Sequence, residues 1–299
     1  NRDHVVLALP EVRLLHRAVL ELPPDLVIDA HEFSVAARWI EKFGALQAVD
    51  LMYLAATHPD IPRTVRDLAE TVFYPALQKA TGANGLATFL YHTTATRIED
   101  KSVAMGGNAS SIARNAFGLM GALSFLLETR GVGIGLEIYQ RRVATHYIAA
   151  KALLETAAQN ADRLRDTVAA ARRGIAESRD DLIVAHRVSR DPVQLPLVDP
   201  ETAADKPVDV VFSDSRKIAV VAKRARPFGY VLMPDAKDAI DELQIFGAAL
   251  CRINAEVEID GEVATVTERA KADRRSINPD QSLKVSLTPR RVLVPAGSV

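Results

Sequence analysis

Leu123-Ser-Phe-Leu-Leu-Glu-Thr-Arg-Gly131 is the stretch of sequence that decides the fold class. Its apolar run ends abruptly in charged residues, as expected of a buried strand that delivers polar side chains at its carboxyl end. The earlier stretch Leu26-Val-Ile-Asp-Ala-His-Glu32 has the same pattern, an apolar run that ends in polar and charged residues. Short apolar strands of this kind are typical of parallel sheets that are covered by helices. We therefore predict an α/β fold with a mixed, largely parallel sheet flanked by helices.

Helix-like and strand-like segments alternate through the first part of the chain. Apolar residues at helical spacing predict helices over residues 10–22 and 61–79, and an Ala-rich run predicts one long or two consecutive helices over residues 136–179. Near residue 180 the character changes, because prolines and alternating strand patterns become frequent. We therefore expect one domain over residues 1–180 and a smaller α+β or β-rich module over residues 181–299.

Composition excludes several classes of protein. The 299 residues are 48% hydrophobic with a formal net charge of −1, which gives no electrostatic footprint for nucleic acid. The longest nearly apolar stretch, residues 117–127, is too short to span a membrane. The single Cys251 excludes an internal disulfide and is expected to be a small buried residue. A periplasmic or secreted location is favoured over a cytoplasmic one, and the oligomeric state is left open.

Asp29 and His31 are predicted to share one face of their strand, because side chains two residues apart point the same way. Asp29 could therefore orient the imidazole of His31, an arrangement typical of metal-binding histidines. Open α/β sheets bind their ligands beyond the carboxyl ends of the strands, which is where this segment ends. A histidine that is merely satisfied by local hydrogen bonds is the alternative interpretation.

Glu128 follows a strongly apolar run. A carboxylate is seldom buried without a partner, so Glu128 is either paired with Arg130 or held in place for function. Burial would raise its pKa and let it act as a general base. Both interpretations stay open on the sequence alone.

The chain opens on Asn1-Arg2. An arginine presents a rigid fork that grips a carboxylate through two hydrogen bonds, which is what an exopeptidase needs to recognise a free C-terminus.

Taken in order, these segments resemble the zinc carboxypeptidases of the carboxypeptidase A type. Members of that family carry an early His-x-x-Glu zinc motif, then Asn-Arg for the substrate carboxylate, then a strand ending in the third zinc ligand, then a strand bearing the general-base glutamate. Here Asn1-Arg2 matches the second element, His31 in Ile-Asp-Ala-His the third, and Glu128 in Phe-Leu-Leu-Glu-Thr-Arg-Gly the fourth. The resemblance covers about residues 1 to 150, and it implies that residues 1–180 are the C-terminal part of a zinc carboxypeptidase-like catalytic domain.

The resemblance implies a Zn²⁺-dependent hydrolase that cleaves C-terminal peptide or related amide bonds. His31 would be a zinc ligand, Glu128 would take the proton of a metal-activated water, and Asn1 and Arg2 would hold the terminal carboxylate of a peptide or peptide-like substrate. The family usually places a tyrosine on a mobile loop before the general base, but residues 106–117 contain none and Tyr91 lies far upstream. Arg114, with its neighbour Asn115, could contact substrate instead, and a solvated pair at a helix end is the alternative.

The first zinc motif of the family is missing, because no histidine of the sequence is followed by Glu three residues later. A catalytic zinc needs three protein ligands and an open position. We therefore expect a chain that is truncated at its N-terminus and at its C-terminus, and that alone neither holds zinc tightly nor hydrolyses peptides. An amidase or deacylase acting on cell-wall peptides or N-acyl amino acids, and a non-catalytic binding module of the same fold, are the alternatives.

Overall fold

The computed structural model describes residues 2–269 and 283–299. The chain divides into two compact units, Pro24–Arg226 and a second unit that joins Asn1–Pro23 to Pro227–Val299. This division differs from the boundary expected near residue 180. Strands on both sides of that position pair within the same sheet, so the backbone hydrogen bonds cross it.

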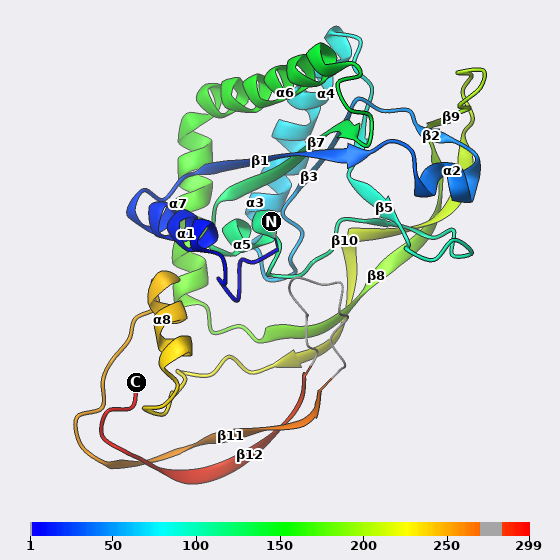
Figure 1. The fold of residues 1–299 in the computed structure, drawn as a ribbon. Coiled ribbons are helices and arrows are strands. Elements are labelled where there is room, and N and C mark those ends of the chain that lie inside the picture. Colours follow the sequence, from blue (N-terminus) through cyan, green and yellow to red (C-terminus); the bar gives the residue numbers. More distant parts are fainter. Residues whose placement is uncertain (1, 270–282) are drawn as a thin grey trace. The chain divides into compact units, whose positions relative to one another are not determined.

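The larger unit is built on a four-stranded sheet with the order β1-β7-β3-β4 (Figure 1). Its strands are β1 (Leu26–Ser34), β7 (Leu123–Val132), β3 (Leu51–Ala55) and β4 (Thr88–Leu90). β1 and β7 are parallel, as are β3 and β4, while β7 and β3 are antiparallel. The predicted mixed α/β sheet is therefore confirmed, and both apolar stretches that predicted it form adjacent strands.

Helices cover one face of this sheet. They are α3 (Arg63–Leu68), the π-helical η1 (Ala69–Phe73), α4 (Tyr74–Ala83), α6 (Tyr139–Gln159) and α7 (Ala161–Glu177). Alternate residues of β7 point into the core that these helices close, and its fully buried members include Phe73, Leu77, Leu123, Phe125, Leu127, Leu153 and Val168. The Ala-rich run thus forms two consecutive helices, and the helix expected over residues 61–79 exists as a continuous run with a π-helical segment inside it.

A second sheet supplies partners for the apolar side chains on the other face. Its order is β5-β6-β10-β8, with β5 (His92–Thr94), β6 (Val103–Met105), β10 (Val208–Arg224) and β8 (Leu182–Leu195). Its apolar side chains pack with Trp39 of α2 (Arg38–Phe43) and with a β3 side chain. β8 and β10 are long antiparallel strands, and β10 pairs with β6, which is why the segments on either side of residue 180 form one unit. The short elements α5 (Ala113–Leu119), β2 (Leu46–Gln47) and β9 (Leu197–Val198) complete this unit.

The smaller unit contains α1 (Pro10–Glu21), α8 (Lys237–Ile245) and the antiparallel pair β11 (Val257–Arg269) and β12 (Leu283–Val294). Pro10 stands at the first helical position of α1, where its fixed φ favours the helix and its missing N–H is not needed. Cys251 is exposed, so its expected burial is wrong. Among the helices of the described residues, none is long and apolar enough to cross a membrane.

Candidate active site

His31 and Glu128 lie side by side in the main sheet. β1 and β7 run parallel with His31 directly opposite Glu128 in the register. Because Leu127 packs into the helix-covered core, the alternation of side chains points Glu128 to the other face of the sheet. The structure therefore brings together two residues that lie far apart in the sequence.

Glu128 is a buried carboxyl group, with 7% of the residue exposed. Burial raises the pKa of this carboxyl to about 7. The positive charge of His31 and a hydrogen bond with the Tyr91 side chain favour the ionised form, but they offset burial only in part. A carboxyl group with a pKa near neutrality is suited to accept a proton and to give it back.

His31 is oriented by Asp29. Its Nε2 lies 2.7 Å from Oδ1 of Asp29, and this hydrogen bond is the main cause of a raised His31 pKa. The hydrogen bond expected from strand alternation is therefore present. It fixes the orientation of the imidazole ring beside Glu128.

Tyr91 was not expected next to Glu128. It lies between β4 and β5, and its backbone N–H donates to the carbonyl of Tyr53 in β3 at 2.9 Å. This tertiary contact holds residue 91 at the sheet, and its side chain forms the hydrogen bond with Glu128. No spacing in the sequence signals this approach, because it depends on how β4 and β5 join different sheets.

Arg114 is buried, with 2% of the residue exposed, so the interpretation as a solvated pair at a helix end is wrong. Its Nη2 donates to the carbonyl of Gly107 at 2.6 Å. Burial lowers the pKa of Arg114 to about 10, against the opposing influence of Tyr91, Tyr74 and Glu128. The neighbouring Asn115 is fully buried and binds backbone groups. Arg114 is therefore a guanidinium fixed within electrostatic reach of Glu128.

Gly106 separates Arg114 from Tyr91. A Cβ atom at position 106 would lie 2.8 Å from Arg114 Nη2 and 2.8 Å from a Tyr91 ring carbon, whereas at position 107 its nearest neighbour would be 3.7 Å away. We expect Gly106→Ala to destabilise the larger unit by about 1–3 kcal/mol, as overpacking does. Gly107→Ala is the matched control and should change the free energy of unfolding by less than about 0.5 kcal/mol.

Urea unfolding measures both changes, and the fluorescence of Trp39, the one tryptophan of the sequence, reports on the larger unit. Equal effects of the two substitutions would contradict the close contact of Arg114 and Tyr91 at Gly106.

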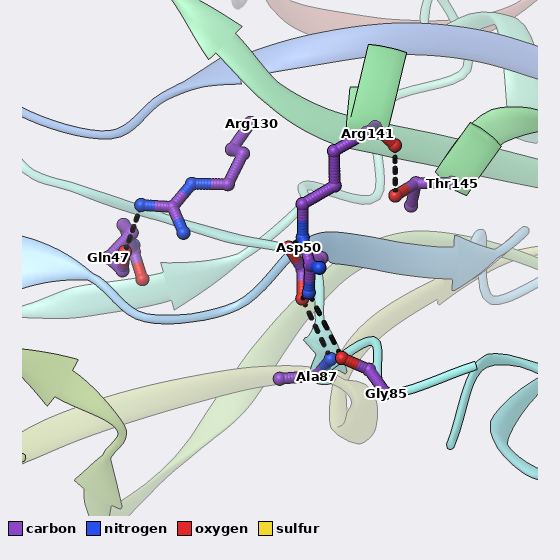
Figure 2. Close-up of polar contacts among 7 residues, drawn as sticks. All are labelled: Gln47, Asp50, Gly85, Ala87, Arg130, Arg141 and Thr145. Carbon is purple, nitrogen blue, oxygen red and sulfur yellow. Dashed lines mark hydrogen bonds and ion pairs between the residues drawn. The ribbon is translucent and has the colours of Figure 1, made fainter. Parts of the chain in front are cut away.

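Arg130 does not neutralise Glu128. Figure 2 shows that the Arg130 side chain reaches Gln47, where its Nη2 donates to the backbone carbonyl at 3.3 Å. The nearby Asp50 is held by Arg141 through two hydrogen bonds of 2.7 and 2.9 Å. Within the described ranges no ion pair joins Glu128 to Arg130. The structure thus gives no support to the interpretation of Glu128 as one half of a structural salt bridge with Arg130.

The proposed carboxylate contacts at the start of the chain are not placed against this site. Asn1 lies outside the described residues, and Arg2 belongs to the smaller unit, whereas His31, Arg114 and Glu128 belong to the larger one. Their suggested role therefore remains a prediction.

The donor set fits a zinc ion only in part. A histidine whose ring is oriented by a carboxylate, as His31 is by Asp29, is the usual form of a zinc-ligating histidine. A catalytic zinc needs three such ligands, and residues 2–269 and 283–299 contain no group of three or more His, Cys, Asp or Glu side chains arranged to hold a metal ion. These residues alone do not complete a zinc site.

Sequence comparisons find distant relatives that are named carboxypeptidase 2. The chain is 28% identical over 304 aligned positions to a probable carboxypeptidase 2 of Trichophyton verrucosum, covering 100% of this chain and 58% of that protein. It is 28% identical over the same span to carboxypeptidase 2 of Trichophyton equinum, covering 56% of that protein. It is 30% identical over 251 positions to carboxypeptidase 2 of Trichophyton rubrum, covering 83% of this chain and 46% of that protein.

The chain therefore spans about half the length of the curated relatives it matches. No family model and no solved structure matches it. The chain is thus distantly similar, over 83% to 100% of its length, to proteins named carboxypeptidase 2.

Proposed function

We propose that the protein is a hydrolase that removes residues from the C-terminus of peptides, with Glu128 as the general base. The observation that carries the proposal is the placement of Glu128, a buried carboxyl group with a pKa of about 7, directly opposite His31 in adjacent parallel strands. The names of the relatives support the same reaction class.

Glu128, Asp29 and Arg114 have separate proposed tasks. Glu128 takes a proton from the attacking water and later delivers it to the leaving amine, for which a pKa near neutrality is suitable. Asp29 holds the His31 ring in one orientation. Arg114 carries a positive charge near Glu128 and is proposed to contact the substrate. Asn1 and Arg2 are proposed to hold the terminal carboxylate of the substrate.

His31 is proposed as the ligand that this chain contributes to a zinc ion. Zinc, when bound, polarises the scissile carbonyl and lowers the pKa of water. No second ligand is proposed, because residues 2–269 and 283–299 contain no group of three or more His, Cys, Asp or Glu side chains arranged to hold a metal ion. Metal analysis of the complete gene product should find zinc, and His31→Gln should remove most of it. Unchanged stoichiometric zinc in that variant would show that His31 is no ligand.

Two peptides that differ only at their C-terminus test the substrate class. The complete gene product should release the last residue of a peptide with a free carboxylate. The same peptide with a C-terminal amide should be cleaved roughly 10²-fold more slowly, because the arginine proposed to bind the terminal carboxylate then has no anionic partner. Mass spectrometry of the products distinguishes the two. Equal cleavage of both peptides would contradict the proposed recognition of a free terminal carboxylate.

A further inference from the structure

A cavity of about 280 Å³ lies at the end of β3, where the chain leaves the main sheet. Its lining combines side chains of the α3–η1–α4 run with Thr57 and with Arg216 of β10. Tyr74, which lines it, belongs to the core on the helix-covered face of the sheet, whereas Glu128 points to the other face. The cavity is thus lined by none of the residues that carry the proposed hydrolysis.

Backbone irregularities in two separate elements bring side chains to this cavity. η1 is a π-helical segment within an otherwise α-helical run, and such turns are frequent at functional sites. Arg216 lies where the pairing of β10 with β8 shifts register, between Asp214 and Ile218. Bulges of this kind re-aim side chains next to binding sites. Asp214 holds the Arg216 guanidinium through hydrogen bonds of 2.7 and 3.0 Å, so this arginine is preset at the cavity.

Buried donor groups at the cavity lack partners within the part of the chain that the structure describes. Nε of Arg66 and the hydroxyl oxygen of Thr57 are buried without a hydrogen-bond partner. The Tyr74 hydroxyl accepts a hydrogen bond from the Ala55 N–H at 2.7 Å. Burial raises the Tyr74 pKa, so the hydroxyl keeps a proton that it can donate. Buried polar groups are normally paired, so these donors indicate a missing acceptor.

Acidic side chains lie at the mouth of the same cavity. Glu70 is exposed and follows Arg66 by about one helical turn. Asp67 is also exposed, with a long 3.5 Å contact to Arg63. The lining therefore combines the buried donors of Arg66 and Thr57 with exposed charged side chains, namely the carboxylates of Asp67 and Glu70 and the guanidinium of Arg63.

We propose that this cavity binds a small zwitterion, namely a free α-amino acid. Its carboxylate accepts hydrogen bonds from Arg66, Thr57 and Tyr74 at the buried end. Its ammonium group faces Glu70 at the mouth. A simple anion such as acetate or inorganic phosphate satisfies the donors but leaves the acidic mouth without a partner, and an amine alone leaves the donors unpaired. Binding does not require the proposed hydrolysis and is measured without it.

Isothermal titration calorimetry of the complete gene product with L-alanine, acetate and inorganic phosphate tests this proposal. L-alanine should bind with one site, and acetate should bind about tenfold more weakly or not at all.

Arg66→Met should weaken L-alanine binding about tenfold to a hundredfold, because it removes a charged donor. Thr57→Val removes a single hydroxyl with nearly the same shape and should weaken it about threefold to tenfold. Glu70→Gln should weaken L-alanine and leave acetate unchanged.

Arg97→Met is the matched control, since Arg97 is an exposed arginine that pairs with Glu99 in a surface loop; it should leave the titration unchanged. Trp39 fluorescence checks that each variant is folded, and Thr57→Val carries the test if Arg66→Met unfolds. The absence of L-alanine binding up to about 10 mM would overturn the proposal. So would L-alanine binding that none of the cavity variants weakens. Equal affinity for acetate and L-alanine, both insensitive to Glu70→Gln, would overturn the assignment to a zwitterion.

Discussion

Replacing Glu128 by glutamine is expected to lower kcat/KM for peptide hydrolysis by about 10² to 10⁴-fold, the loss typical of a missing general base. The amide is nearly isosteric with the carboxyl group and cannot accept the proton of water. His31, Asp29 and the sheet around them stay in place, so zinc content and folding should not fall. Steady-state kinetics with a free C-terminal peptide measure the loss, and near-normal turnover would exclude Glu128 as the base.

Glu32→Gln is the control. Glu32 neighbours His31 in β1 but its side chain points to the opposite face, where Arg142 Nη2 lies 2.6 Å from its Oε1. Neutralising it removes a carboxylate from the same strand without touching the proposed base, so activity should stay within about threefold of the wild type.

Glu128→Gln is expected to lower activity but to raise the free energy of unfolding near neutral pH. The Glu128 pKa is raised from 4.5 to about 7 in the folded chain. Well below pH 4.5 the carboxyl is protonated in both the folded and unfolded states, so its titration should cause no difference in stability between wild type and Glu128→Gln there. As the pH rises toward 7 the unfolded state loses this proton first, and the wild type is destabilised relative to the neutral amide. A more stable but inactive variant at pH 8 is therefore expected, as is common at active sites.

Phe125→Ala is expected to destabilise the larger unit by about 3–5 kcal/mol. Phe125 is fully buried in β7, and its ring centroid lies 5.7 Å from that of Phe73 and 6.0 Å from that of Tyr74. Removing the ring leaves a cavity between the sheet and the η1–α4 segment, and these side chains cannot collapse to fill it without moving the helical backbone.

Tyr147→Ala provides the comparison. Tyr147 is an aromatic residue of α6 that is 67% exposed, so its removal should change the free energy of unfolding by less than about 0.5 kcal/mol. Urea unfolding followed by Trp39 fluorescence measures both variants in the unit to which Trp39 belongs. A loss below about 1 kcal/mol for Phe125→Ala would contradict the packing of β7 against these helices.

Local sequence patterns predicted the central part of the fold. The apolar runs that became β1 and β7 predicted buried strands, and strand alternation predicted the hydrogen bond between Asp29 and His31. These features depend on neighbouring residues in one element. The His31–Glu128 pairing needed one more step, since it requires β1 and β7 to be adjacent, parallel and in one particular register.

Other features depend on contacts between distant segments and left no local signal. The start of α5 is one example, because this helix begins after Ile112 without a side-chain cap. Arg114 in this helix is buried by its contacts with the loop at Gly107, which composition alone could not indicate. The boundary expected near residue 180 rested on a proline-rich composition, which does not reveal that β10 pairs with β6.

The titration of the Glu128 carboxyl carbon, followed by ¹³C NMR in the zinc-free wild type and in zinc-free His31→Gln, tests the central claim most directly. A buried carboxyl beside His31 should titrate with a midpoint of about 7 in the wild type. Its midpoint should move higher in His31→Gln, because the histidine charge that favours the carboxylate is removed. A wild-type midpoint near 4.5, or a midpoint that does not respond to His31→Gln, would contradict the claim that these two residues form one site.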